Sequence, residues 1–232
     1  MAGGHTDRPP RLKSARARVA EATIIGAAVV LFLVAAGLGV AFHSYSVSAG
    51  AMAPTLVKGD YLIVSNVAYV FGHSPDRGDI VALRRPRLNR SVYIKRIVGI
   101  PGDRIQLKNG VVYLNGAPLQ RVALGRGTEM GPFGLTRPVE RFRETLPSGR
   151  FYTTFSYGAG SELENTGTYL VPGGQYFVLG DNRDNAVDSR LPEALGGGYV
   201  PAADITGRAE VVISWSGRTD DGRSGPSFRV LK

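Results

Sequence analysis

Cysteine is absent from the 232 residues of the chain. The chain therefore has no disulfide framework, no thiolate metal site and no cysteine nucleophile. Histidine is nearly absent: the three residues are His5, His43 and His73. They are not spaced for a metal site or for a Ser-His-Asp triad. We therefore expect neither a metal nor another cofactor.

The sequence has one long hydrophobic stretch, residues 23–42, and this stretch contains no charged side chain. About 20 apolar residues are enough to cross a bilayer core of roughly 30 Å. Five basic residues precede this stretch: Arg8, Arg11, Lys13, Arg16 and Arg18. The positive-inside rule then places the chain before the stretch in the cytoplasm. The sequence predicts a cytoplasmic basic tail (1–22), one transmembrane helix (23–42) in the cytoplasmic (inner) membrane, and a periplasmic or other extracytoplasmic C-terminal domain.

A cleaved signal peptide is the competing interpretation of this N-terminal region. The residues Ala49-Gly50-Ala51 have the small-x-small pattern of a signal peptide cleavage site. The apolar run is longer than the hydrophobic region of a usual signal peptide, however. We therefore favour an anchor that is not removed, with the lipid bilayer as a partner.

The charge balance is basic, with a formal net charge of +9 and a pI of about 10. Such a balance can indicate binding to nucleic acid or to anionic lipid. The arginines are scattered along the chain, however, and no aromatic-rich RNA motif or zinc spacing accompanies them. We therefore expect no nucleic acid partner.

From residue 60 onward, short apolar runs bounded by Gly, Pro and Asp predict strands. We expect them at 61–64, 79–83, 91–100, 105–108, 111–114, 151–155, 169–171, 175–179 and 209–215. Asn109-Gly110, between two of these runs, is typical of a tight hairpin turn. No convincing helical pattern follows residue 43, and residues 121–150 show no clear periodicity, so there we expect an insertion or a long loop. The sequence predicts an antiparallel all-β body.

Lys95 lies in one of these expected strands. Alternation puts Lys95 on the same face as Tyr93 and Ile97, so it shares that face with apolar neighbours. A lysine that is withdrawn from water has a lowered pKa and can act as a general base. The strand pattern by itself favours the simpler interpretation, an edge lysine whose amine reaches solvent.

Residues 180–190 are dense in Asp, Asn and Arg and follow an apolar strand. Such a loop can be held rigid by its own ion pairs, with Arg183 and Arg190 facing Asp184 and Asp188. A calcium loop is the alternative, but the run lacks the glycine and the closing glutamate of an EF-hand. We therefore expect an internally bonded loop without a metal.

Three separated segments together resemble the bacterial type I signal peptidases (leader peptidases), which are Ser/Lys endopeptidases. They are Ser48–Leu56, Tyr93–Asp103 and Gly180–Arg190, in that order, and Arg77–Val81 is similar to a further box of the family. The resemblance covers roughly residues 43–215. It implies one membrane anchor followed by an extracytoplasmic antiparallel β body with an inserted β subdomain at about 104–175, and a C-terminal tail at 216–232.

The resemblance also implies roles for individual residues. Lys95 occupies the general-base position, and Ala51 occupies the position of the serine nucleophile. Ala49 stands where the family has a hydroxyl donor to the oxyanion, and Ala186 where a serine orients the lysine. The motif positions that complete the pattern are Met52, Pro54, Asp181, Asn182, Arg183, Asp184, Asp188 and Arg190.

Two functions follow from these positions. One is a signal peptidase I-type membrane endopeptidase that removes signal peptides from exported preproteins, inactive as it stands unless another residue replaces the missing serine. Ser44, Ser46, Ser48 and Thr55 are poorly placed to do so. The other is a membrane-anchored pseudoprotease that binds signal peptides or partner proteins without cutting them. A basic membrane-surface protein with no peptide site is a third interpretation, which the three motifs disfavour.

Overall fold

The computed structural model describes residues 26–31, 37, 39, 41–70, 72–84, 91–131, 135–214 and 227–231. The chain divides into two compact units, residues 1–41 and 42–232. In the first unit, residues 26–31, 37, 39 and 41 are helical. Within these described stretches, no helix has both the length and the apolar character needed to cross a membrane. Half of the expected span at 23–42 lies outside the described residues, and its last residue, Phe42, is in a strand instead.

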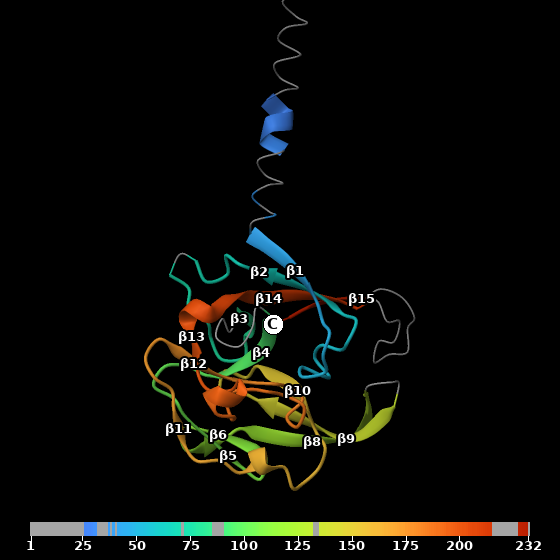
Figure 1. Cartoon of the computed structure of the whole chain (residues 1–232), viewed down its shortest axis with the longest axis vertical. Coiled ribbons are helices and arrows are strands. Elements are labelled where there is room, and N and C mark those ends of the chain that lie inside the picture. The colour runs from blue at the N-terminus through green and yellow to red at the C-terminus, as the bar shows by residue number, and fades with distance from the viewer. Residues whose placement is uncertain are drawn as a thin grey trace, which may run out of the picture. The chain divides into compact units, whose positions relative to one another are not determined.

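The second unit is mainly β, as the sequence predicts (Figure 1). Its largest sheet has the strand order β1-β2-β14-β3-β4-β12-β13, with β15 also paired to β14, and all these pairs are antiparallel. The strands are β1 (Phe42–Ser46), β2 (Tyr61–Ser65), β3 (Ile80–Arg84), β4 (Val92–Gly99), β12 (Gln175–Leu179), β13 (Val200–Pro201), β14 (Ile205–Ser214) and β15 (Ser227–Val230).

Two smaller sheets are built from the chain between β4 and β12. One has the order β11-β5-β6-β7, with β5 (Arg104–Lys108), β6 (Val111–Leu114), β7 (Ala117–Pro118) and β11 (Tyr169–Leu170). The other has the order β10-β9-β8, with β8 (Gln120–Met130), β9 (Thr136–Thr145) and β10 (Phe151–Ser156). Short 3-10 turns complete the described unit: η2 (Glu162–Glu164), η3 (Glu193–Leu195) and η4 (Ala202–Asp204).

The Asn-Gly turns form as predicted. Asn109 and Gly110 both have positive φ, 49° and 74°, and they connect β5 to β6 with Lys108 opposite Val111. Only a turn with two left-handed residues matches the twist of a two-residue hairpin, and Asn and Gly adopt that conformation most readily. Asn115 and Gly116 repeat this arrangement, with φ of 54° and 87°, between β6 and β7.

The expectation of a loop at 121–150 was wrong. Strands β8 and β9 form a long antiparallel hairpin there, in register from Gln120 opposite Thr145 to Met130 opposite Thr136. Only three side chains of the two strands are buried, and two of them are acidic: Glu129, Val139 and Glu144. A ribbon with so few buried apolar side chains lacks the alternation that identifies a strand from sequence.

Apolar side chains of separate sheets pack into several clusters. One lies between the large sheet and the first smaller sheet and includes Val98, Ile105, Leu107 and Phe177. Another joins β2 and β14 to the loop that follows β1, through the buried side chains of Met52 and Leu56. The first motif of the resemblance is thus attached to the body by its two apolar residues.

A glycine in β14 lies where two strands approach closely. A Cβ on Gly207 would lie 2.5 Å from the backbone oxygen of Ser65 and 2.7 Å from Cγ1 of Val64. We predict that Gly207→Ala lowers the free energy of unfolding by about 1–3 kcal/mol, since the strand would have to shift. Gly173→Ala is the control, because a Cβ there meets nothing within 4 Å. Chemical denaturation of both variants should separate them, and equal midpoints would contradict the prediction.

Candidate active site

The loop between β1 and β2 contains the first motif. Its ends are tied together by hydrogen bonds from Val47 N–H to the Asp60 oxygen (2.8 Å) and from Gly59 N–H to the Val47 oxygen (2.9 Å). Within it, Ala53 N–H donates to the Gly50 oxygen (3.0 Å). Met52 is buried, whereas Ala51 is half-buried and Ala49 is exposed. Met52, Ala53 and Leu56 are therefore directed inward, whereas Ala49 and part of Ala51 remain at the surface.

The third motif packs directly on the first. Asn182 donates its backbone N–H to the Ala51 oxygen (3.1 Å) and its side-chain Nδ2 to the Gly50 oxygen (3.2 Å). Gly180 lies between the two motifs, since a Cβ there would be 2.3 Å from Cβ of Ala186 and 2.6 Å from the Ala51 oxygen. Residues 51 and 186, which are 135 positions apart in the sequence, therefore lie on the same small volume around Gly180.

Strand β4 contributes the second motif. The side chain of Lys95 is buried, with 5% of its surface exposed, and its Nζ donates to the Ile94 oxygen at 3.2 Å. The interpretation of Lys95 as a solvent-reaching edge lysine is therefore wrong, because β3 covers one edge of the strand and neighbouring apolar side chains cover its face. Its neighbour Arg96 is buried as well.

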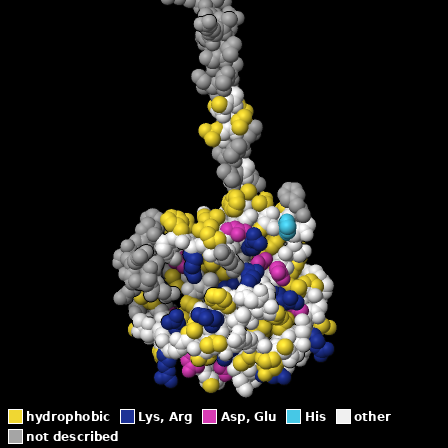
Figure 2. All heavy atoms as spheres, turned by 180° about the vertical axis from the view of Figure 1, so that it is seen from behind, with side chains coloured by type: hydrophobic (Ala, Val, Ile, Leu, Met, Phe, Trp, Pro, Cys, Tyr) yellow, Lys and Arg dark blue, Asp and Glu magenta, His cyan; other side chains and the backbone are white. Residues whose placement is uncertain are grey.

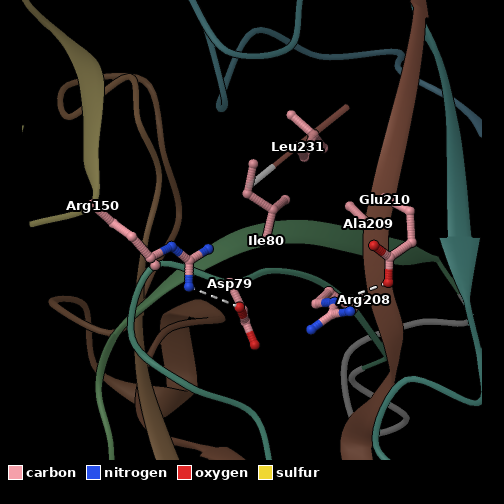
Figure 3. A pocket seen from close by; sticks show the side chains of 8 residues that line it. Asp79, Ile80, Arg150, Arg208, Ala209, Glu210 and Leu231 are labelled. Carbon is pink, nitrogen blue, oxygen red and sulfur yellow. Dashed lines mark hydrogen bonds and ion pairs between the residues drawn. The ribbon is translucent and has the colours of Figure 1, made fainter. Parts of the chain in front are cut away.

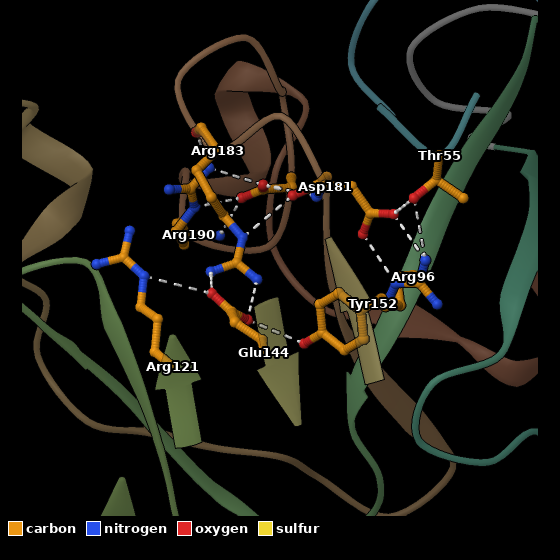
Figure 4. A network of polar contacts seen from close by, with 10 residues as sticks. Thr55, Arg96, Arg121, Glu144, Tyr152, Asp181, Arg183 and Arg190 are labelled. Carbon is orange, nitrogen blue, oxygen red and sulfur yellow. Dashed lines mark hydrogen bonds and ion pairs between the residues drawn. The ribbon is translucent and has the colours of Figure 1, made fainter. Parts of the chain in front are cut away.

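Arg96 links all three motifs (Figure 4). Its guanidinium forms a two-pronged pair with Asp181, from Nε to Oδ1 at 2.8 Å and from Nη2 to Oδ2 at 2.6 Å. The hydroxyl of Thr55 donates to the same carboxylate. Burial lowers the pKa of Arg96, but the charge of Asp181, its hydrogen bonds and smaller contributions together more than offset this, so the pKa lies above its ordinary value.

A second buried pair anchors the third motif to the hairpin. Arg183 reaches Glu144 of β9, with Nη1 to Oε1 at 2.7 Å and Nη2 to Oε2 at 2.5 Å. The hydroxyl of Tyr152 donates to Oε2 of the same carboxylate at 3.1 Å. Burial, and then the Glu144 charge, raise the pKa of Tyr152, so its hydroxyl stays protonated. The expected pairing of Arg183 within its own loop is thus corrected, since its partner comes from the hairpin.

The pair between Arg190 and Asp188 is internal to the 180–190 loop, as predicted. Arg190 holds Asp188 through Nε and Nη2, both at 2.8 Å, and its Nη2 also reaches the Arg183 oxygen. Asp188 in turn accepts from the Gly180 N–H at 3.1 Å. Asp184 does not pair with an arginine in the described contacts; it accepts from the Ser156 hydroxyl at 3.0 Å and from a backbone N–H at 2.7 Å. The loop is rigid because nearly every charged group in it has a fixed partner.

Sequence reasoning missed Glu129, which comes from β8 of the hairpin. Its carboxylate accepts from Nδ2 of Asn182 (2.7 Å) and from the hydroxyl of Tyr157 (2.7 Å). A Cβ on Gly50 would lie 2.7 Å from its Oε1, so it lies against the first motif as well. No pattern in residues 121–150 pointed to it, because the contact depends on the register of a hairpin that the sequence did not predict.

The hollow drawn in Figure 3 lies elsewhere. It has a volume of about 230 Å³ and is lined by Asp79, Arg150, Arg208, Glu210 and four other residues, none of them an expected site residue. Its charges are already paired, Arg150 with Asp79 at 3.2 Å and Arg208 with Glu210 at 2.9 Å. Figure 2 shows Lys and Arg spread over one face with Asp and Glu between them. Among the described residues, no group of three or more His, Cys, Asp or Glu side chains could hold a metal ion.

Comparison with known proteins identifies the family to which this chain belongs. The family model described as "Signal peptidase, peptidase S26" matches residues 17–215. The chain is a member of the signal peptidase S26 family. Among its curated relatives, signal peptidase I of Rickettsia typhi (strain ATCC VR-144 / Wilmington) is 35% identical, and the match covers 74% of this chain and 73% of the relative.

A second curated relative agrees with this assignment. Signal peptidase I of Rickettsia conorii (strain ATCC VR-613 / Malish 7) is 34% identical, with the same coverage of 74% and 73%. A crystal structure of a signal peptidase I from Enterococcus faecalis V583 is 26% identical and has a TM-score of 0.34. The match covers 58% of this chain and 96% of that one. The resemblance found in the three motifs is confirmed at the level of the family.

The Arg96–Asp181 pair gives a stability prediction for this signal peptidase family member. Asp181→Ala would leave a buried guanidinium without its carboxylate, so we expect a loss of about 3–5 kcal/mol in the free energy of unfolding. Glu210→Ala removes the partner of Arg208, whose side chain is 40% exposed, and should change that free energy by no more than about 1 kcal/mol. Urea unfolding of the full chain in detergent measures both. Similar losses in the two variants would show that burial does not set the strength of these pairs.

Proposed function

We propose that the chain is a signal peptidase I-type membrane protein that binds the signal peptides of exported preproteins and whose hydrolytic step is disarmed. One observation carries this proposal. The carbonyl of Ala51, at the proposed nucleophile position, accepts the backbone N–H of Asn182 in the third motif. This contact supports a common site for segments that lie 131 residues apart in the sequence.

The strand register supports including Lys95 in the same site. Strand β12 pairs with β4 through Val178 opposite Ile97 and Leu179 opposite Arg96. One further residue along this register aligns Gly180 with Lys95, and aligned residues of an antiparallel pair direct their side chains to the same face. The space beside Gly180 is the one that Ala51 and Ala186 border.

The proposed roles explain which step of the hydrolytic reaction the chain has lost. In a Ser/Lys endopeptidase, a neutral lysine amine takes the proton of a serine hydroxyl, and the serine oxygen attacks the scissile carbonyl. We assign the general-base position to Lys95 and the nucleophile position to Ala51. We assign the oxyanion donor position to Ala49 and the lysine-orienting position to Ala186. A methyl group has no proton to give and no lone pair to attack with, so the covalent route is closed.

The other hydroxyls near the motif give no obvious replacement. Thr55 donates its hydroxyl to Asp181 and lies beside Arg96 in the structural network, so its oxygen is committed there. Ser44 and Ser46 belong to β1, which pairs with β2. Ser48 is exposed and three positions before Ala51. These observations favour binding without cleavage over an enzyme with a substitute nucleophile.

The first half of β4 is the proposed place for a bound peptide. In the described residues, β3 pairs with β4 from Val92 to Arg96, and β12 pairs with it at Arg96, Ile97 and Gly99. An extended peptide can bind beside a strand through main-chain hydrogen bonds, while pockets select its side chains. The half-buried side chains of Val92 and Ile94 pack on the cluster that contains Met52, and so offer an apolar wall for small residues.

The N-terminal sequence supports a membrane location. The apolar run ends at Phe42, nine positions before Ala51, and basic residues precede it. We propose that residues 23–42 anchor the chain with its N-terminus in the cytoplasm, which leaves the second unit outside. A site so close in sequence to the anchor suits signal peptides, whose cleavage points emerge at the bilayer surface.

Binding and cleavage can be measured separately. We expect the purified full-length chain in detergent to bind a preprotein whose signal peptide ends in Ala-x-Ala, and to release no mature product over hours. Product released at that bond, and abolished by Lys95→Ala, would instead establish an active enzyme with another nucleophile. Absence of both binding and cleavage would exclude a signal peptide site.

Restoring hydroxyls should restore cleavage. We predict that Ala51→Ser gives measurable cleavage, and that adding Ala49→Ser and Ala186→Ser raises the rate by about 100-fold, because one side-chain oxyanion donor is typically worth 100- to 1,000-fold. Lys95→Ala in the triple variant should remove the activity. Ala117→Ser, at an exposed position, is the matched control. A correctly folded triple variant that remains inert would show that the proposed pocket is wrong.

A further inference from the structure

Glu129 is a buried carboxylate that the proposed chemistry does not use. It lies near the end of β8 and is 8% exposed. Three donors surround it: Nδ2 of Asn182 at 2.7 Å, Nδ2 of Asn185 at 3.4 Å and the hydroxyl of Tyr157 at 2.7 Å. A buried carboxylate needs such donors to offset its lost hydration, so its position is strongly determined.

The carboxylate fixes which way the Asn182 amide points. Nδ2 of Asn182 donates to Glu129 and also to the Gly50 oxygen. With the amide flipped, its oxygen would face two acceptors, which is unfavourable. The asparagine is fully buried, so it cannot turn to solvent instead. Glu129 therefore holds the Asn182 amide in the orientation that binds the first motif.

Asn182 in turn orients one peptide group of that motif. The Gly50 carbonyl and the Ala51 N–H belong to the same planar trans peptide, so they point in opposite directions. The Gly50 oxygen is held by Nδ2 of Asn182 and by the Ala53 N–H at 3.0 Å. With the carbonyl held on that side, the Ala51 N–H is directed away from Asn182.

We propose that Glu129 is a positioning residue for the Ala51 N–H, which it aims through Asn182 at the oxygen of a bound peptide's carbonyl or carboxylate. This inference rests on the proposed function, because it assigns the donor to the same peptide site. The glycine at 50 fits the role: a Cβ there would lie 2.7 Å from Oε1 of Glu129 and 3.2 Å from Nδ2 of Asn185. The carboxylate lies directly against the main chain that it orients.

The charge of Glu129 argues for an indirect role. A carboxylate that faced a developing oxyanion would destabilise it. Here the carboxylate oxygens are engaged by donors from Asn182, Asn185 and Tyr157. Its influence on the peptide site therefore passes through the amide of Asn182, and the hairpin that contains it becomes part of the site's support.

Two peptides report on the donor. Both end in Ala-x-Ala, one as the free carboxylate and one as the amide, and each is titrated into the full-length protein in detergent. The carboxylate peptide should bind about tenfold more tightly, because hydrogen bonds to charged acceptors are the stronger ones. It should also move the amide proton resonance of Ala51 downfield, which separates this donor from the charge of Lys95.

Variants of Glu129 should lose this signature and keep general binding. In Glu129→Ala we expect the preference for the carboxylate to fall below threefold and the Ala51 shift to vanish, with the affinity for the amide peptide reduced by a smaller factor than that for the carboxylate peptide. Glu129→Gln keeps an oxygen that can accept from Asn182, so it should retain most of the preference. Glu140→Ala removes a half-buried glutamate of the same hairpin and should behave like the parent. If Glu129→Ala fails to fold, Glu129→Asp, one methylene shorter, takes its place.

Hydrogen exchange separates this inference from the proposed function. Without any peptide, the Asn182 backbone amide, which donates to the Ala51 oxygen, should exchange at least tenfold faster in Glu129→Ala than in Glu140→Ala. Unchanged exchange would overturn the inference, and so would an unchanged carboxylate preference or an equal loss of both peptides. If neither peptide binds the parent but exchange rises in Glu129→Ala, the proposed function fails while the positioning of the loop by Glu129 stands.

Discussion

The ion pair between Arg96 and Asp181 joins the parts of the molecule on which the site depends. Arg96 lies in β4, and Asp181, 85 positions further along the chain, lies in the turn after the neighbouring strand β12. Thr55 of the first motif donates its hydroxyl to the same carboxylate. Both charges are almost fully removed from water, which carries a large desolvation penalty. The penalty is offset by a two-pronged geometry, by the Gly78 oxygen at 2.8 Å and by the ring of Tyr152, 4.2 Å from the guanidinium carbon. Arginine suits this place because its planar fork bonds several acceptors at once.

A second buried ion pair connects the same network to the hairpin formed by β8 and β9. Arg183 and Glu144 connect the 180–190 loop to β9, and Tyr152 lies between the two ion pairs, with its ring on Arg96 and its hydroxyl on Glu144. Because the pairs share Tyr152, movement of the hairpin would disturb both of them. The hairpin has few apolar contacts of its own, so polar contacts with the loop fix its position. The polar contacts that position the hairpin also hold Glu129 of β8 against the first motif.

The sequence predicted β2, β3, β4, β12 and the second half of β14 in the large sheet, because these segments alternate or run apolar between Gly, Pro and Asp. It also predicted the Asn109-Gly110 turn from its chemistry. A common site for Ala51, Lys95 and Ala186 is a proposal that comes from the family resemblance and not from spacing. The hairpin was missed because its buried side chains are mainly glutamates, and Glu129 and Glu144 look like solvent-exposed residues in a basic, Gly-rich stretch. Their contacts depend on how β8 and β9 pair over ten residue pairs, which no local sequence pattern predicts. β15, in the segment that the sequence analysis assigned to a tail, pairs with the preceding strand β14, with Ser214 opposite Ser227.

The contacts described at the proposed site need no side-chain hydroxyl at positions 51 and 186. Ala51 contributes its carbonyl to Asn182, and Ala186 contributes only a methyl group against Gly180. The side chains that hold the motifs together are instead arginines, carboxylates and asparagines. A hydroxyl could therefore be lost at 49, 51 or 186 without removing any contact on which the fold depends. Under the proposed function, the architecture of the peptide site is thus physically separable from catalytic capacity, and such a site can keep its shape without the hydrolytic step.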